Sequence, residues 1–296
     1  DRKYAIEHVT EALIADLPPA TRTAALFALA RYQEADGDRS TAIGTYKDLA
    51  LNGETASDSA EALWNLAAVA RDLRDEAREK EALRDLISLF PASDRALEAL
   101  NASTLATAAE CAYVLFRHRA NTEATAAYQP LASDPDPVVR GQAHYYLGIL
   151  SERAGDPGQA LNEYGLAIEA LPGTGSALLG DAYWDRGLVF EAAGRQDEAV
   201  QHYAAIADVT PSHDRAAEGL FRAGLIRYRQ GWHDDAASLW GRSSQAAATG
   251  DLARAGFWWA KASAQQGDFF NQAQHLESAV AAAPLSYYGL RARAIL

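Results

Sequence analysis

The sequence predicts an all-α fold, a solenoid of about seven antiparallel helical hairpins. Alanine makes up about a fifth of the 296 residues, which favours helices that pack closely through small side chains. Runs of β-branched residues, which strands prefer, are scarce. One pattern of small, glycine, aromatic and proline residues recurs at intervals slightly above about 34 residues. Single hairpins of this kind cannot bury their apolar faces alone, so we expect them to stack in one continuous series.

The first part of the chain contains one isolated helix and three weaker copies of this pattern. The stretch from Tyr4 to Asp16 has an apolar stripe at helical spacing, so it either caps the first hairpin or is the second helix of a truncated repeat. The marks of the three copies are Leu29-Ala30, Gly37, Ala42, Tyr46 and Leu49; Leu66-Ala67, Leu83, Leu86 and Pro91; and Ala112, Leu115, Ala124, Tyr128 and Leu131. The spacing stretches between Ser93 and Ser103, which predicts a longer connection or helix there.

Four stronger copies follow from Gly141 onward. Their marks are Leu147-Gly148, Gly155, Ala160, Tyr164, Ala167 and Pro172; Gly187, Phe190, Gly194, Ala199, Tyr203 and Pro211; Ala223-Gly224, Gly231, Ala236 and Trp240; and Trp259-Ala260, Gly267, Leu276, Ala279 and Pro284. The small residues let two helices approach closely, and the aromatic fills the space beside them. The glycine ends the first helix, and the proline prevents the second from continuing. Across residues 173–180 the interval between repeat marks is again longer than usual.

The end of the chain predicts one further helix, with Ser286 as its N-cap. We therefore expect three parts: a cap or truncated repeat at 1–20, the repeat solenoid at 21–284, and at 285–296 the start of a helix or linker towards a further domain. A helix this short is marginal alone, so it should dock on the last hairpin, with Tyr287 or Tyr288 near Trp258 or Trp259. Tyr287, Tyr288 and Gly289 are the candidate domain-junction residues.

Composition and motifs argue against several classes of function. A net charge of −13 without a basic cluster disfavours nucleic acid, and no apolar run is long enough to span a membrane. The seven histidines never fall three or four apart on one helix, and the single Cys111 is expected to be a buried structural thiol, so we predict no metal site and no cofactor. No catalytic motif is present; Glu277-Ser278 lacks the continuation that a glycan-cleaving acid motif requires.

The repeat register supplies the binding candidates. Three residues before the small residue of each first helix, six of seven copies carry an aromatic, with Ala109 as the exception. These groove candidates are Phe27, Trp64, Tyr145, Trp184, Phe221 and Phe257. Such a ladder can stack on sugar rings or receive a protein segment, or it can simply pack against the neighbouring repeat. Both interpretations remain open from the sequence.

From Thr21 to Pro284 these marks resemble the tetratricopeptide repeat family. The resemblance implies a right-handed superhelix, with the aromatic position of each first helix on its concave face. The peptide clamp for acidic C-termini known in that family needs lysine and asparagine on this face, where the present chain has aromatic and apolar residues.

The closing segment carries a second resemblance. Residues 257–262, 266–268 and 282–290, which read FWWAKA, QGD and AAPLSYYGL, resemble the end of the helical region in soluble lytic murein transglycosylases. This implies a non-catalytic domain, located in the cell envelope, that positions peptidoglycan glycan strands or partners for a lysozyme-like domain after Leu296. The alternative is a stand-alone scaffold for protein–protein interaction in envelope assembly. We expect no enzymatic activity from these residues themselves.

Overall fold

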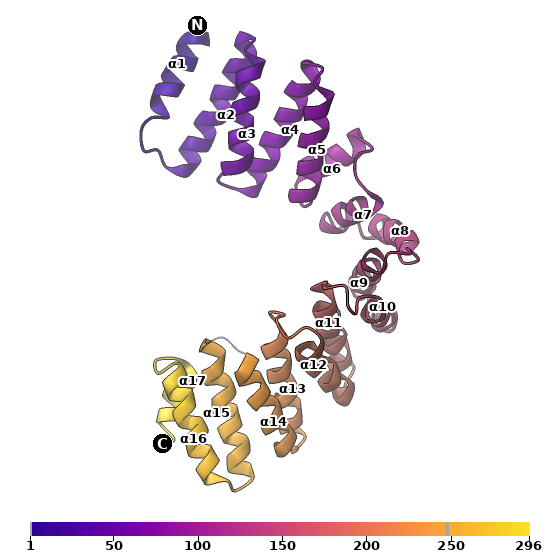
Figure 1. Ribbon diagram of the computed structural model, residues 1–296, viewed down its shortest axis with the longest axis vertical. Helices are drawn as coiled ribbons and strands as arrows, with labels where there is room; N and C mark the ends of the chain where they lie inside the picture. The colour runs from indigo at the N-terminus through magenta and orange to yellow at the C-terminus, as the bar shows by residue number, and fades with distance from the viewer. Residues whose placement is uncertain (1, 247–248) are drawn as a thin grey trace. The chain divides into compact units, whose positions relative to one another are not determined.

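The computed structural model describes residues 2–246 and 249–296. In that part of the chain it contains seventeen α-helices and no strand (Figure 1), which confirms the predicted all-α fold of stacked helical hairpins. The chain divides into two compact units, Asp1–Tyr128 and Gln129–Leu296. This boundary falls inside the stretch 21–284 that the sequence treats as one solenoid, because the repeat pattern continues across it. The three-part division drawn from the sequence stays a prediction.

The first unit begins with a single helix that packs on the first hairpin. Its helices are α1 (Arg2–Ala12), α2 (Pro19–Asp36), α3 (Arg39–Asn52), α4 (Ala56–Asp72), α5 (Glu76–Leu89), α6 (Asp94–Ala102) and α7 (Ala108–Arg117), with α8 (Asn121–Leu131) running across the boundary. Helices α2 and α3 form one hairpin and α4 and α5 the next. The stretched spacing after Ser93 contains α6, a short helix that packs on both α4 and α5.

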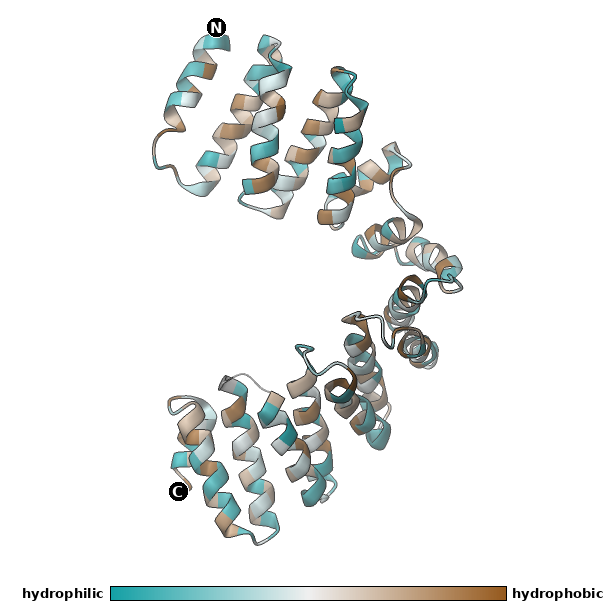
Figure 2. Cartoon of the chain, in the orientation of Figure 1, coloured by the Kyte–Doolittle hydropathy of each residue, from teal (hydrophilic) through white to brown (hydrophobic). Residues whose placement is uncertain are grey.

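The second unit is a regular stack of four hairpins followed by a short helix. Its helices are α9 (Pro137–Arg153), α10 (Pro157–Ala170), α11 (Leu178–Ala192), α12 (Gln196–Val209), α13 (Ala216–Arg229), α14 (His233–Ala246), α15 (Thr249–Gln265), α16 (Phe269–Ala282) and α17 (Tyr287–Arg293). Each helix packs on the next one in sequence, and the first helices of successive hairpins touch where α9 meets α11 and α13 meets α15. Hydrophobic and hydrophilic residues alternate along the helices (Figure 2), as expected when only one face of each is buried.

Local sequence explains where these helices begin and end. Side chains of Asp, Ser or Thr accept a hydrogen bond from the first helical turn, for example Asp156 before α10 and Ser286 before α17. Gly155 and Gly194 end first helices with positive φ values of 78° and 74°. In the two weakest repeats Arg74 and Arg119 adopt the same conformation at φ 58° and 56°, which explains why the glycine mark is missing there.

Small residues and aromatics pack inside each hairpin as the repeat pattern predicts. A β-carbon on Gly148 would lie 2.5 Å from the Tyr164 ring, and one on Gly224 would lie 2.5 Å from Nε1 of Trp240. Both aromatic side chains are fully buried. The helices therefore approach more closely than any larger residue at the glycine positions would permit.

No helix among the described residues has both the length and the hydropathy needed to cross a bilayer.

Candidate functional site

The six groove candidates are mostly covered by the protein itself. Tyr145, Trp184, Phe221 and Phe257 have at most 8% of their surface exposed. Phe27 and Trp64 are partly buried against the core of the first unit. The rings of Phe27, Tyr145, Trp184 and Phe221 each contact the aromatic of the second helix in the same hairpin, with centroids 5.3–6.4 Å apart. The geometry favours the packing interpretation, and a direct role of these six residues in binding stays a prediction.

Arginines cover three of these rings. The guanidinium carbon of Arg95 lies 5.2 Å from the Trp64 ring centre, Arg215 lies 5.0 Å from Trp184, and Arg254 lies 4.0 Å from Phe221. Such cation–π contacts are electrostatically attractive. Each arginine also pairs with a carboxylate three residues before the aromatic; these carboxylates are Glu61, Asp181 and Glu218. We call this arrangement the acid–arginine–aromatic latch.

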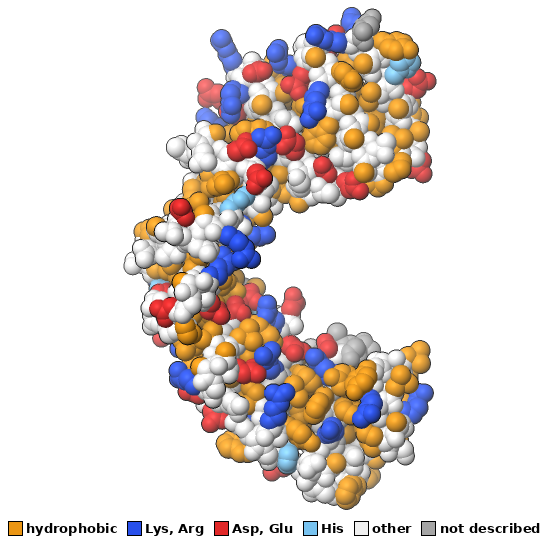
Figure 3. Space-filling model, turned by 180° about the vertical axis from the view of Figure 1, so that it is seen from behind, with side chains coloured by type: hydrophobic (Ala, Val, Ile, Leu, Met, Phe, Trp, Pro, Cys, Tyr) orange, Lys and Arg blue, Asp and Glu red, His pale blue; other side chains and the backbone are white. Residues whose placement is uncertain are grey.

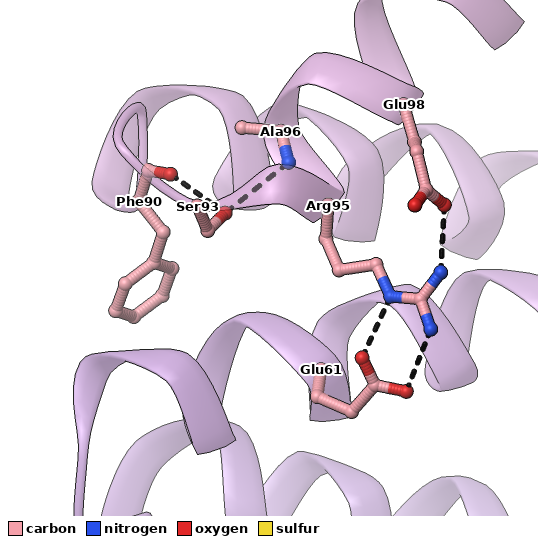
Figure 4. A network of polar contacts seen from close by, with 6 residues as sticks. All are labelled: Glu61, Phe90, Ser93, Arg95, Ala96 and Glu98. Carbon is pink, nitrogen blue, oxygen red and sulfur yellow. Dashed lines mark hydrogen bonds and ion pairs between the residues drawn. The ribbon is translucent and has the colours of Figure 1, made fainter. Parts of the chain in front are cut away.

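In the latch on Trp64, the arginine holds its carboxylate through two hydrogen bonds; Figure 4 shows these polar contacts of Arg95. Arg95 donates from Nε to Glu61 at 2.6 Å and from Nη2 to the other oxygen of Glu61 at 3.0 Å. Its Nη1 donates to Glu98 at 2.6 Å. Ser93 starts α6 by accepting from the backbone N–H of Ala96, and this cap positions Arg95 at the first turn. The latch ties α4 to α6 across 34 residues of sequence.

A second latch of the same spacing occurs in the second unit. Pro91-Ala-Ser-Asp-Arg95-Ala-Leu-Glu-Ala-Leu and Pro211-Ser-His-Asp-Arg215-Ala-Ala-Glu-Gly-Leu share proline, Asp-Arg-Ala, glutamate and leucine. Cavities of about 670 and 700 Å³ lie beside Arg95 and Arg215, each lined within its own unit. The latches could not be seen in the apolar and glycine marks of the repeats, because their residues are charged. The recurring Pro-x-x-Asp-Arg-Ala string was the signal that could have revealed them.

A further groove lies in the second unit, lined from the first helices of three successive hairpins and from the start of α10. It has a volume of about 670 Å³. It is lined by Glu152, Pro157, Leu188, Val189, Glu191, Ala192, Ala193 and Arg222. Leu188, Val189, Ala192 and Ala193 form a continuous apolar ledge at the end of α11, Glu152 projects from α9, and Arg222 comes from α13. We call this the α11 groove.

At one end of the α11 groove, two carboxylates accept hydrogen bonds from tyrosine hydroxyls. Asp185 lies one helical turn before Leu188 and accepts a hydrogen bond of 2.9 Å from the Tyr145 hydroxyl. The pKa of Asp185 is raised from 3.8 to about 6, mainly by burial, and the charges of Glu152 and Asp181 contribute to this rise. The Tyr145 hydrogen bond and the charge of Arg215 oppose this rise without cancelling it. Glu152 accepts the hydroxyl of Tyr164.

At the other end of the groove, the negative charge of Glu191 is paired with the positive charge of Arg222. Arg222 donates to Glu191 at 2.7 Å, and the Tyr203 hydroxyl donates to the same oxygen at 2.9 Å. Burial alone would raise the pKa of Glu191, but these hydrogen bonds and the charge of Arg222 leave it lowered. The α11 groove thus presents an apolar ledge, with Glu152 in its lining and the half-buried Asp185 beside it at one end, and with the paired Glu191 and Arg222 at the other.

Among the described residues no group of histidine, cysteine, aspartate and glutamate could hold a metal ion. Cys111 is only partly buried, where a fully buried thiol was expected; its pKa is raised by burial and by Glu110. Acidic and basic side chains are interspersed on the face of each unit that Figure 3 draws.

The junction residues dock as predicted, although with a different ring partner. Ser286 caps α17, which packs on α15 and α16. Tyr288 contacts Phe257 with ring centroids 5.6 Å apart and joins the same cluster as Trp258, whereas Tyr287 is 68% exposed. Gly289 is required for this docking, because a β-carbon there would lie 2.1 Å from the carbonyl oxygen of Ala283. A role of these residues in joining a further domain stays a prediction.

Comparison with known proteins matches one part of the chain to a family model. Residues 61–93 match a tetratricopeptide repeat model. A search of curated proteins finds no sequence that matches this chain. Among solved structures, the C-terminal part of a repeat-containing protein of the tetratricopeptide class from Cytophaga hutchinsonii is similar at 14% identity and a TM-score of 0.50, covering 90% of this chain and 98% of that one.

Two other solved structures are similar over shorter parts of this chain. YrrB, described as a tetratricopeptide protein with an unusual peptide-binding site, has 17% identity and a TM-score of 0.44, covering 68% of this chain and 96% of its own. PilF of Pseudomonas aeruginosa has 14% identity and a TM-score of 0.43, covering 81% and 99%. The family match and the helical hairpins together show that this chain has a tetratricopeptide-like helical repeat fold.

Proposed function

We propose that this chain is a scaffold that binds a segment of another protein in the α11 groove. The observation that carries the proposal is the groove itself, about 670 Å³ in volume and lined from α9, α11 and α13. An extended or helical segment can contact three hairpins at once there, whereas a small molecule would need a more enclosed pocket. Apolar side chains of the segment would be buried against the ledge, and the charged residues at its two ends would fix the direction in which the segment binds.

Selection from a displayed library of short random peptides tests this proposal. We expect enriched peptides with dissociation constants of about 1–100 µM, typical of single-segment recognition. Leu188→Asp should abolish their binding by placing a charge on the apolar ledge, and Leu285→Asp, at a side chain that is 84% exposed outside the groove, should not. Failure to enrich any peptide, or equal loss in both variants, would refute the proposal.

A second candidate follows from the closing segment, which resembles the helical region of lytic murein transglycosylases. In this version the chain lies in the cell envelope and positions glycan strands for a lysozyme-like domain. Its support is the resemblance of residues 257–290 and the docked helix α17 that continues from them. Cosedimentation with purified peptidoglycan sacculi tests it. Sedimentation in the absence of any peptide ligand would favour this candidate over the scaffold.

A further inference from the structure

We propose that the partner segment is basic, and that the α11 groove receives one of its lysine or arginine side chains. The aliphatic part of that side chain would lie on Leu188, Val189 and Ala192, and its charged end would lie among Glu152 and Asp185. This inference rests on the proposed scaffold function and adds the chemistry of the partner. Lysine and arginine suit such a site, because both carry an apolar stem that ends in a cation.

The apolar ledge supplies the first step of the argument. Leu188 and Ala192 lie one turn apart at the end of α11, and Val189 and the C-cap residue Ala193 form a second pair one turn apart next to them. Val189 is 5% exposed, while Ala192 and Ala193 are exposed. The small alanines keep the ledge open, so a methylene chain can lie along it without displacing a side chain of the protein.

The second observation is the set of charged and hydroxyl groups around Asp185. Hydroxyl and charged groups act on Asp185 from several elements: Tyr145 and Glu152 on α9, Tyr164 on α10, Asp181 on α11, Tyr203 on α12, and Arg215 at the start of the third hairpin. Glu191 and Arg222 line the α11 groove itself. The two arginines are already engaged, Arg222 with Glu191 and Arg215 with Asp181. The hydrogen-bond donors to the half-buried Asp185 and to its neighbour Glu152 are the hydroxyls of Tyr145 and Tyr164, and neither Arg215 nor Arg222 donates to them. A cation brought by a partner would supply the missing charge.

The equivalent place in the first unit lacks this chemistry. The segments 61–100 and 181–220 align without gaps at an offset of 120, with Trp64 matching Trp184 and Arg95 matching Arg215. On that alignment Asn65 stands for Asp185, and Arg71 stands for Glu191. The latch is shared by both units, whereas the acidic end occurs in the second alone. The acidic end is therefore not needed to build a hairpin of this type.

Fluorescence anisotropy with defined probes tests the inference. The probes are a labelled peptide of alternating lysine and alanine, the same peptide with acetylated lysines, and the same peptide with glutamate in place of lysine. We expect the lysine peptide to bind the full chain at least about tenfold more tightly than the acetylated one, and the glutamate peptide to show no binding. Affinity should increase as pH rises from about 5 to 7, because Asp185 ionises in that range.

Matched variants separate the groove from the overall negative charge. Glu152→Gln and Asp185→Asn should each weaken binding of the lysine peptide about three- to tenfold, and Asp185→Asn should flatten its pH dependence. Glu277→Gln, an exposed carboxylate on α16, removes the same charge outside the groove and should have little effect. An equal loss in Glu277→Gln, or tight binding of the acetylated peptide, would overturn the inference.

The outcomes distinguish this inference from the scaffold function. If library peptides without basic residues bind in the groove and Leu188→Asp abolishes that binding, the scaffold function stands and the basic partner is wrong. If no peptide of any charge binds, both are wrong. Circular dichroism of each variant confirms that the chain remains helical.

Discussion

Replacement of Asp185 by asparagine is expected to stabilise the protein at pH 7 and to leave its stability unchanged at about pH 3.5. The pKa of Asp185 is about 6 in the folded protein, against 3.8 without perturbation. A shift of about two units corresponds to roughly 3 kcal/mol, because each unit is about 1.4 kcal/mol. The side chain keeps some contact with water, and the new amide needs partners of its own, so we expect a net gain of about 1–2 kcal/mol.

The sign follows from proton binding. Between pH 3.8 and about 6 the folded state holds the proton of Asp185 while the unfolded state has released it. This carboxyl group therefore makes the wild type lose stability as pH rises through that range, and the loss is complete above about pH 6. The asparagine variant lacks this loss, so the two stability curves should separate with rising pH.

Urea unfolding at several pH values measures the effect. Five of the six tryptophans, at positions 184, 232, 240, 258 and 259, lie in the second unit, so their fluorescence reports mainly on the unit that contains Asp185. Glu277→Gln controls for the loss of one negative charge at an exposed site. A variant at Asp185 that is no more stable than wild type at pH 7 would show that this carboxylate is already well compensated, which would also weaken the case for a cationic partner.

Three further substitutions test the packing. Gly224→Ala should cost about 1–3 kcal/mol in the free energy of unfolding, because its β-carbon meets the Trp240 ring; thermal unfolding checks this, and an unchanged melting temperature would contradict the close approach. Trp184→Ala should cost about 3–5 kcal/mol by leaving a cavity beside the core, and a small loss of stability with a large loss of peptide binding would instead support its role as a groove residue. Gly289→Val should undock α17, since its side chain would clash with the backbone of Ala283. Amides of residues 287–296 would then exchange hydrogen faster than in the wild type, and slow exchange in both would contradict this account.

The hairpins could be predicted from the sequence because their determinants are local and periodic. Gly148 and Tyr164 lie 16 positions apart inside one repeat, and the same pair of residue types returns in the next. The helix α6 could only be inferred as a stretched spacing, since its nine residues add no repeat mark. One turn carries no glycine mark, because Arg74 adopts the backbone conformation that glycine takes in other repeats.

The site was far less predictable, because it depends on charge and burial across repeats. Asp185 and Tyr145 are 40 positions apart, and aspartate is not among the residue types that mark a repeat. In the sequence Asp185 is one of 40 acidic residues, and only the packing of α9 against α11 distinguishes it. The sequence identified the aromatic ladder by residue type, but the exposure of its rings depends on packing: four contact the aromatic of the second helix in their own hairpin, and three lie under an arginine.

The acid–arginine–aromatic latches also bear on how the stack would yield under tension. Hairpins that contact only their neighbours carry a pulling force in series, so the weakest junction opens first. Arg95 holds Glu61 through two parallel hydrogen bonds, a geometry that resists sliding more than a single contact does. The junction between α4 and α6 should therefore outlast unlatched junctions of the same unit, and the chain would lengthen in ordered steps rather than all at once.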